Sequence, residues 1–207
     1  MPPQNDKGTL VRLKGLPRLF RKQDAEKIAP HSAVFLSRAE KKGFIQRLNR
    51  GNYINSFLFG LAPIEEVACF LKSPGYVSCE WALHYHGLIL QVPSVCTVLS
   101  LSSAVGRHRS VTYQGIRIEF SMISPRLFFG FQTIDNFNMA VAEKALLDTL
   151  YYRKGILPVE DEIELEGLDH ARLMDMAGAY PATVSAVARR LLNVMDSEKS
   201  LECQRLM

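Results

Sequence analysis

One stretch of the chain, residues 20–55, constrains the fold most, because two helical patterns and a hairpin pattern follow one another within it. Residues 23–29 have the apolar spacing of a helix of about two turns, which Pro30 ends. A second helical pattern begins at Ser32, whose hydroxyl is expected to cap it, and Gly43 stops it. The sequence therefore predicts two short helices joined by a tight turn.

The second helix is expected to have one buried and one exposed side. Leu36 and Ala39 are three residues apart and face inward. The outward side chains are Ser37, Arg38, Lys41 and Lys42. After the helix, residues 44–48 alternate apolar with polar, residues 49–52 tolerate positive φ, and residues 53–54 return. This pattern predicts a tight β-hairpin.

Two helices followed by a hairpin predict a winged helix-turn-helix, in which the second helix lies in the major groove of DNA. Ser37, Arg38 and Lys41 are expected to reach base edges or nearby phosphates, while Ser32 binds a phosphate near the start of the helix. The hairpin is expected to grip the flanking backbone or the minor groove. The candidate DNA-binding residues are Ser32, Ser37, Arg38, Lys41, Lys42, Arg47, Asn49 and Arg50.

The charge distribution favours this interpretation. Residues 1–55 hold twelve Lys or Arg and four Asp or Glu, a net charge of +8, whereas residues 56–207 hold thirteen and seventeen, a net charge of −4. Clustered cations are typical of a protein that binds a polyanion. The alternative is that this is an ordinary helix-helix-hairpin unit whose Lys and Arg side chains are merely solvated.

Composition bounds the class of protein. A chain of 207 residues with 47% hydrophobic and 22% charged residues can form one large or two small cores. Without an apolar run long enough to cross a bilayer or a secretory leader, we expect a cytoplasmic protein without membrane contact. The four cysteines and the pair His84 and His86 match no zinc pattern, so neither a metal site nor a cofactor is expected.

The fold class expected is α+β, with a winged helix-turn-helix over residues 1–60 and a mixed α/β domain over residues 61–207. In the second part we expect a small antiparallel or mixed sheet between helices. The expected helices are 63–71, 78–87, 138–154, 168–179 and 182–194, and the expected strands are 94–101, 110–113, 116–123 and 127–133. The basic loop 106–109 is a further candidate for contact with nucleic acid, or a solvated turn.

The order of these segments resembles the AbiEi-type antitoxin family of transcriptional regulators over about residues 9–155. The resemblance rests on three motifs: Gly51-Asn52-Tyr53 after the lysine-rich helix, residues 82–87 with the sequence ALHYHG, and the pair Leu147-Asp148. It implies an N-terminal domain that binds double-stranded operator DNA and represses its own operon, with a dimer on inverted repeats as one arrangement. It also implies a second domain that counters a nucleotidyltransferase-like toxin without obligate contact.

Two other functions remain open from the sequence alone. The second domain could sense a small molecule or a partner protein, with a pocket lined by the aromatic residues Trp81, Tyr85, Phe128, Phe129 and Phe131, although such residues are usually core material. The chain could instead be a nucleic-acid-processing enzyme. The sequence carries neither the Gly-Ser turn with paired carboxylates of nucleotidyl transfer nor a nuclease pattern, and we expect no catalysis.

Overall fold

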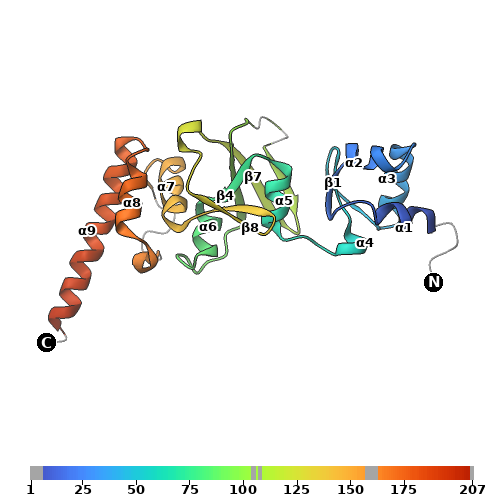
Figure 1. The fold of residues 1–207 in the computed structure, drawn as a ribbon. Coiled ribbons are helices and arrows are strands. Elements are labelled where there is room, and N and C mark those ends of the chain that lie inside the picture. Colours follow the sequence, from blue (N-terminus) through green and yellow to red (C-terminus); the bar gives the residue numbers. More distant parts are fainter. Residues whose placement is uncertain (1–6, 104–105, 107–108, 157–162, 206–207) are drawn as a thin grey trace. The chain divides into compact units, whose positions relative to one another are not determined.

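The computed structural model describes residues 7–103, 106, 109–156 and 163–205. The chain divides into two compact units, Met1–Leu71 and Lys72–Met207, and both α-helices and β-sheets are present (Figure 1). The sequence predicts a domain boundary near residue 60, where the net charge and the hydrophobic pattern change. The helix that follows that point groups with the first unit.

The first unit contains five helices and a three-stranded sheet within the described part of the chain. Its elements are α1 (Lys7–Leu13), β1 (Leu19–Arg21), α2 (Lys22–Ile28), α3 (Ser32–Lys41), β2 (Gln46–Asn49), β3 (Asn52–Ile54), α4 (Ser56–Phe59) and α5 (Ile64–Leu71). The strands are antiparallel in the order β1-β3-β2, so the hairpin β2–β3 is joined by the short strand that precedes α2. The two helices and the hairpin expected from residues 20–55 are therefore present.

A single apolar core holds the first unit together. Its buried residues are Leu13, Leu16, Phe20, Ala25, Ala29, Phe35, Leu36, Ala39, Ile45 and Tyr53. The rings of Phe20 and Tyr53 stack with centroids 5.5 Å apart, which joins β1 to β3. The buried Asn55 side chain donates to the carbonyl oxygens of Leu13 and Leu16, at 2.9 and 3.4 Å, and so ties the end of the hairpin to the end of α1.

The second unit is built on a six-stranded mixed sheet. Its elements are β4 (Gly75–Ser78), α6 (Cys79–Tyr85), β5 (Val95–Ser100), β6 (Ser110–Tyr113), β7 (Ile116–Met122), η3 (Pro125–Leu127), β8 (Phe131–Ile134), β9 (Phe137–Ala140), α7 (Ala142–Tyr152), η5 (Leu165–Gly167), α8 (His170–Ala177) and α9 (Ala182–Arg205). The strand order is β6-β7-β5-β4-β9-β8, with β5 parallel to β7 and β4 parallel to β9. Helices α6 and α7 pack together and on β4, while α8 and α9 pack on α7 (Figure 1).

The structure corrects three predicted elements of the second unit. Residues 138–154 are not one helix, because Phe137–Ala140 forms β9 between β4 and β8 and the helix begins only at Ala142. Residues 127–130 are not strand, because Pro125 starts a 3-10 turn and Gly130 has a φ of +71°. The last helix continues to Arg205 instead of ending near residue 194.

The inward face of α9 also differs from the one that the apolar spacing predicts, which consists of Val184, Val187, Leu191 and Val194. Val184, Ala188 and Leu192 are buried at four-residue spacing, whereas the predicted Val187 and Leu191 are half-buried. The helix is therefore rotated slightly from the expected orientation, with the 184-188-192 row turned away from solvent; α7 and α8 both pack on α9. The side chain of Val194, also predicted to face inward, lies outside those that the structure describes.

A buried ion pair lies at the centre of the second unit. Lys144 and Asp148, one turn apart on α7, are both fully buried, and the Lys144 Nζ is 2.5 Å from Asp148 Oδ1. Lys144 also donates to the hydroxyl oxygens of Tyr76 and Tyr180, at 2.9 and 2.5 Å. Asp148 accepts from Tyr76, Tyr180 and Ser78, at 3.1, 2.6 and 2.7 Å. Both charges are thus hydrogen-bonded on several sides, as buried charges require.

This polar cluster joins three parts of the unit. Tyr76 and Ser78 belong to β4, Lys144 and Asp148 to α7, and Tyr180 to the turn between α8 and α9. Burial, reinforced by the Asp148 carboxylate, raises the pKa of both tyrosines far above the usual 10. Burial also lowers the pKa of Lys144, and Asp148 opposes that shift.

Removing one partner of the buried pair should destabilise the protein strongly. We expect Asp148→Asn to lower the free energy of unfolding by roughly 3–5 kcal/mol, because it leaves the Lys144 ammonium buried without its counter-charge. Urea denaturation followed by circular dichroism measures this. The matched control is Arg117→Ala, which breaks an ion pair with Glu119 that is largely in water and should cost about 0–1 kcal/mol. Equal losses in the two variants would contradict the role of the buried pair.

The buried tyrosines predict a loss of stability at high pH. Because their folded pKa lies above the unfolded value, the stability that they contribute is complete below about pH 10 and is lost as the pH rises. Lys144 acts in the opposite direction, but only below about pH 10.5. Between pH 10.5 and 11.5 we expect the free energy of unfolding to fall less steeply in Tyr180→Phe than in the original chain, by up to ~1.4 kcal/mol per pH unit. Parallel curves would refute this.

Candidate nucleic-acid interface

Helix α3 (Ser32–Lys41) has two sides of opposite character. Phe35, Leu36 and Ala39 are buried in the core of the first unit. The exposed Ala33 and Glu40 lie at the edge of the opposite side, whose centre consists of Val34, Ser37, Arg38 and Lys41, which are also exposed. Because residues three, four and seven apart share one face of a helix, these four side chains form one continuous stripe, which we call the α3 stripe.

The cations of the α3 stripe are available for an external partner. Within the described residues, neither Arg38 nor Lys41 forms an ion pair. On α2, by contrast, Lys22 pairs with Glu26 at 3.2 Å and Lys27 with Asp24 at 3.0 Å. Positive charge is therefore neutralised on α2 and left free on the stripe.

Asp24, which pairs with Lys27 on α2, stays ionised. The backbone N–H of Arg21 and the ammonium of Lys27 hold the pKa of Asp24 below its usual range.

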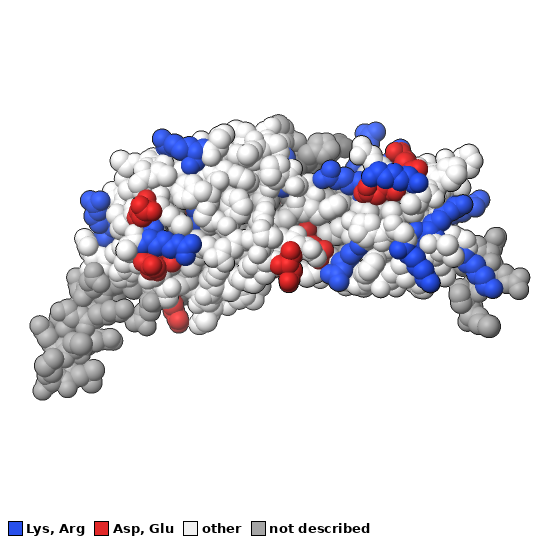
Figure 2. All heavy atoms as spheres, viewed as in Figure 1, with Lys and Arg blue, Asp and Glu red and all other residues white. Residues whose placement is uncertain are grey.

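Figure 2 shows one face of the molecule, on which the first unit carries several Lys and Arg side chains and fewer acidic ones. The predicted contact residue Lys42 is also exposed. These features leave the first unit with a predominantly cationic surface.

Ser32 does not take the position predicted for it. It is the first residue of α3, whose N-cap is His31, and no side-chain hydrogen bond caps the helix. Ser32 is only 9% exposed. Most of the Ser32 surface is therefore covered by the protein, unlike that of the residues of the α3 stripe. The prediction was wrong because Pro30 and His31 complete the turn one residue earlier than the capping pattern suggested.

The hairpin β2–β3 carries the second group of predicted residues. Arg47 and Arg50 are exposed, and the Arg47 Nε donates to the carbonyl oxygen of Asn49 at 3.1 Å. Asn49 is half-buried, and its Oδ1 accepts from the Asn52 side chain at 2.6 Å. Gly51 supplies the positive φ of 86° that the turn needs, and its carbonyl accepts from the backbone N–H of Lys22. Asn49 thus organises the turn, and the two arginines project from it.

Other arginines near the candidate interface already contact groups of the protein and are less available to an external partner. Arg18 forms an ion pair with Glu66 at 3.1 Å, and the guanidinium of Arg21 lies 5.6 Å from the centre of the Phe70 ring. In the loop 106–109, Arg109 is exposed, and residues 107–108 lie outside the described part of the chain. Among the described residues, the α3 stripe and the hairpin hold exposed cations without an ion pair, as do Lys7, Arg12 and Lys14 in and after α1.

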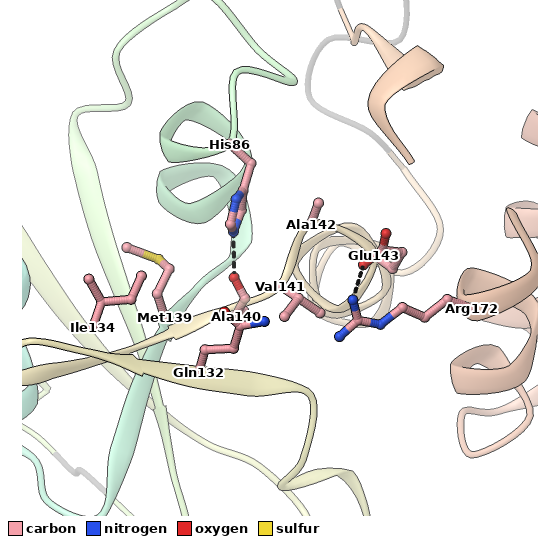
Figure 3. Close-up of a pocket in the computed structure, with 9 residues that line it drawn as sticks. All are labelled: His86, Gln132, Ile134, Met139, Ala140, Val141, Ala142, Glu143 and Arg172. Carbon is pink, nitrogen blue, oxygen red and sulfur yellow. Dashed lines mark hydrogen bonds and ion pairs between the residues drawn. The ribbon is translucent and has the colours of Figure 1, made fainter. Parts of the chain in front are cut away.

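A cavity of about 210 Å³ lies in the second unit (Figure 3). It is lined by His86, Gln132, Ile134, Met139, Ala140, Val141, Ala142, Glu143 and Arg172. Glu143 at the start of α7 is buried; it accepts from the backbone N–H of Asp169 and lies 3.8 Å from the guanidinium of Arg172. The volume is below the ~300–1,000 Å³ of typical small-molecule sites. The cavity has room only for a small molecule, and more than half of its lining residues are apolar.

The residues singled out for metal or ligand binding have structural contacts instead. The ring nitrogens of His84 and His86 bond to the carbonyl oxygens of Ile89 and Ala140, at 3.1 and 2.7 Å. Among the described residues, no three His, Cys, Asp or Glu side chains are grouped as metal ligands. Cys69, Cys79 and Cys96 are buried free thiols.

Cys79 stands out among the thiols because its φ is +57° at the junction between β4 and α6. Burial raises the pKa of its thiol well above the usual value, and the Asp148 carboxylate adds to this shift. A buried, protonated thiol is a poor nucleophile. The residue therefore belongs to the core of the second unit.

The aromatic residues considered for a pocket line no part of the cavity. Phe128 and Phe131 pack against Tyr76, with ring centroids 5.4 and 4.7 Å apart, and Phe129 lies beside the ammonium of Lys144. Trp81 is buried, whereas Tyr85 is exposed. The sequence alone does not distinguish these two roles, because aromatic residues that line a pocket and aromatic residues of a core occur at similar spacing along a chain.

Comparisons with models of known protein families and with curated proteins find no match to this chain. Within the described ranges, every helix is too short or too polar to span a lipid bilayer.

The two sides of α3 should respond differently to truncation. We expect Leu36→Ala to lower the free energy of unfolding by roughly 2–5 kcal/mol, because it empties part of the core. Arg38→Ala removes an exposed side chain and should change it by less than about 0.5 kcal/mol. Thermal and urea unfolding of the two variants measure the difference. A large loss in Arg38→Ala would show that Arg38 supports the fold.

Proposed function

We propose that this protein is a DNA-binding transcriptional repressor whose first unit is a winged helix-turn-helix. The element order α1-β1-α2-α3-β2-β3 and the strand order β1-β3-β2 support this assignment. In it, α2 and α3 are the helix-turn-helix, α3 enters the major groove, and the hairpin β2–β3 is the wing. The function is one of binding, without catalysis or a cofactor. It places the chain in the cytoplasm, with the DNA.

The observation that carries the proposal is the α3 stripe. Arg38 and Lys41 project from the side of α3 opposite to the core and have no acidic partner within the described residues. Exposed, unneutralised cations on one helix face, next to a hairpin that carries two more, suit a groove flanked by phosphates. Arg38 is placed to reach a guanine edge, and Arg47 and Arg50 to hold the flanking backbone.

We further propose that the repressor is an antitoxin of the AbiEi type. Support comes from the structural roles of the motif residues: Gly51 forms the turn of the hairpin, Tyr53 stacks on Phe20, and Asp148 is the anion of the buried cluster. The proposal includes regulation of its own operon, binding as a dimer to inverted repeats, and a nucleotidyltransferase-like toxin as functional partner. A neighbouring reading frame without such a toxin would count against this part.

DNA binding should depend on salt through specific side chains. The measurement is fluorescence anisotropy with a duplex from upstream of the gene and a scrambled duplex, at several salt concentrations. We expect Arg50→Ala to weaken binding to both duplexes and to lower the slope of log K against log salt by roughly 1. Arg38→Ala should cost roughly 1–3 kcal/mol on the upstream duplex and reduce the preference for it.

The matched control is Lys27→Ala, which removes one positive charge from α2, where Lys27 already pairs with Asp24. We expect it to leave the affinity ratio of the two duplexes unchanged and to alter the salt slope less than Arg50→Ala does. Binding of the original chain that does not vary with salt would contradict the proposal, since contacts to phosphates release counterions.

A further inference from the structure

The α3 stripe changes character along its length. Val34 lies in the first turn of α3 and is 50% exposed, whereas Arg38 and Lys41 lie in the second half of the helix. Ser37 separates them, and Ala33 next to Val34 is also exposed. The stripe therefore begins apolar and ends cationic.

This order is the one expected of a helix whose N-terminal turn lies deepest in the major groove. The N-terminal residues of such a helix contact base edges, and later residues come closer to the phosphate backbone. Among the groups on base edges in that groove, the C5 methyl of thymine is the apolar one, and apolar side chains contact it. A branched aliphatic side chain at position 34 suits that methyl group, the long Arg38 side chain one turn later can still reach a base edge, and Lys41 at the end of the helix suits the phosphates.

We propose that Val34 is a specificity-determining residue that contacts the C5 methyl of a thymine in the operator. The inference rests on the DNA-binding function proposed above. It also sets a spacing: Val34 and Arg38 are four residues apart, or about 6 Å along the helix. One base-pair step is about 3.4 Å. The thymine therefore lies one or two base pairs from the base that Arg38 contacts.

The chain offers a matched control for this contact. Val11 on α1 (Lys7–Leu13) is 68% exposed. Val11→Ala therefore makes the same chemical change as Val34→Ala on another helix of the same unit. Both side chains are exposed, so neither substitution opens a cavity in the core. Circular dichroism and thermal unfolding verify that both variants fold.

The experiment removes single methyl groups from the DNA. The probe is the duplex that the original chain enriches most from a randomised duplex library, and each thymine in it is replaced in turn by deoxyuridine. We expect one deoxyuridine substitution to weaken binding of the original chain and of Val11→Ala about fourfold to tenfold. That thymine should lie within two base pairs of the base whose identity no longer affects the affinity of Arg38→Ala. Val34→Ala should weaken binding to the unmodified duplex by a similar factor, and the same deoxyuridine substitution should then have no further effect.

Several outcomes would overturn the inference while leaving the proposed function intact. In one, every deoxyuridine substitution weakens binding equally in the original chain and in Val34→Ala. In another, the library gives salt-dependent binding without a preferred sequence. In a third, the thymine whose replacement weakens binding lies more than two base pairs from the base whose identity no longer affects the affinity of Arg38→Ala. If the original chain bound no duplex at all, the proposed function would fail first, and the inference with it.

Discussion

A ten-residue helix can bury only one side, and this constraint decides what the first unit presents to its surroundings. Rotating α3 to cover Arg38 would bring Leu36 into water and a guanidinium into the core, and both changes are unfavourable. The packing of Phe35, Leu36 and Ala39 therefore determines the composition of the exposed stripe. The core of the first unit and the exposed stripe therefore depend on different residues of α3, so under the proposed function the stripe can vary without loss of the core.

The hairpin follows the same division of roles. Gly51, Asn49 and Asn52 form its turn, while the guanidinium groups of Arg47 and Arg50 remain at the surface. The backbone bond from Lys22 to Gly51 links the turn to the start of α2. A turn that is held on both sides loses less conformational entropy when it meets a ligand than a free loop does.

The second unit depends on a different kind of interaction. The ion pair of Lys144 and Asp148 is enclosed by tyrosine hydroxyls from β4 and from the turn before α9. A buried pair of this kind need not add net stability, because desolvation offsets the attraction between the charges. The contacts of the pair come from β4, α7 and the turn before α9, so an arrangement that separated Lys144 from Asp148 would leave a charge unpaired in the core.

The parts of the fold that are encoded locally could be predicted from the sequence. The spacing of Leu36 and Ala39 was enough to orient α3, and the Gln114-Gly115 step located the hairpin β6–β7. Strands β1 and β4 were missed because each has only three or four residues and pairs with residues far along the chain, as Tyr76 does with Leu99. Strand β9 pairs with β8 across a two-residue turn and was missed because residues 138–141 fit the helical pattern that continues into α7.

The candidate site was predictable to a similar degree. The exposure of Arg38 and Lys41 followed from helical periodicity, whereas the burial of Ser32 depended on where the preceding turn ended. Val34 was missed, although its three-residue spacing from Ser37 was a usable signal. No local signal marks Lys144 as buried either, since a lysine four residues before an aspartate looks like an ordinary surface pair of a helix.

Gly130 has a consequence for how this sequence can diverge. A Cβ at position 130 would lie 3.1 Å from Cδ of Lys144, and the φ of +71° there already disfavours other residues. Replacing this glycine would push on the lysine stem, while shortening the lysine would strand the Asp148 carboxylate. Position 130 is therefore held to glycine by its backbone even if Lys144 makes room, whereas positions 144 and 148 constrain each other, since a change at either one leaves the other charge buried without its counter-charge.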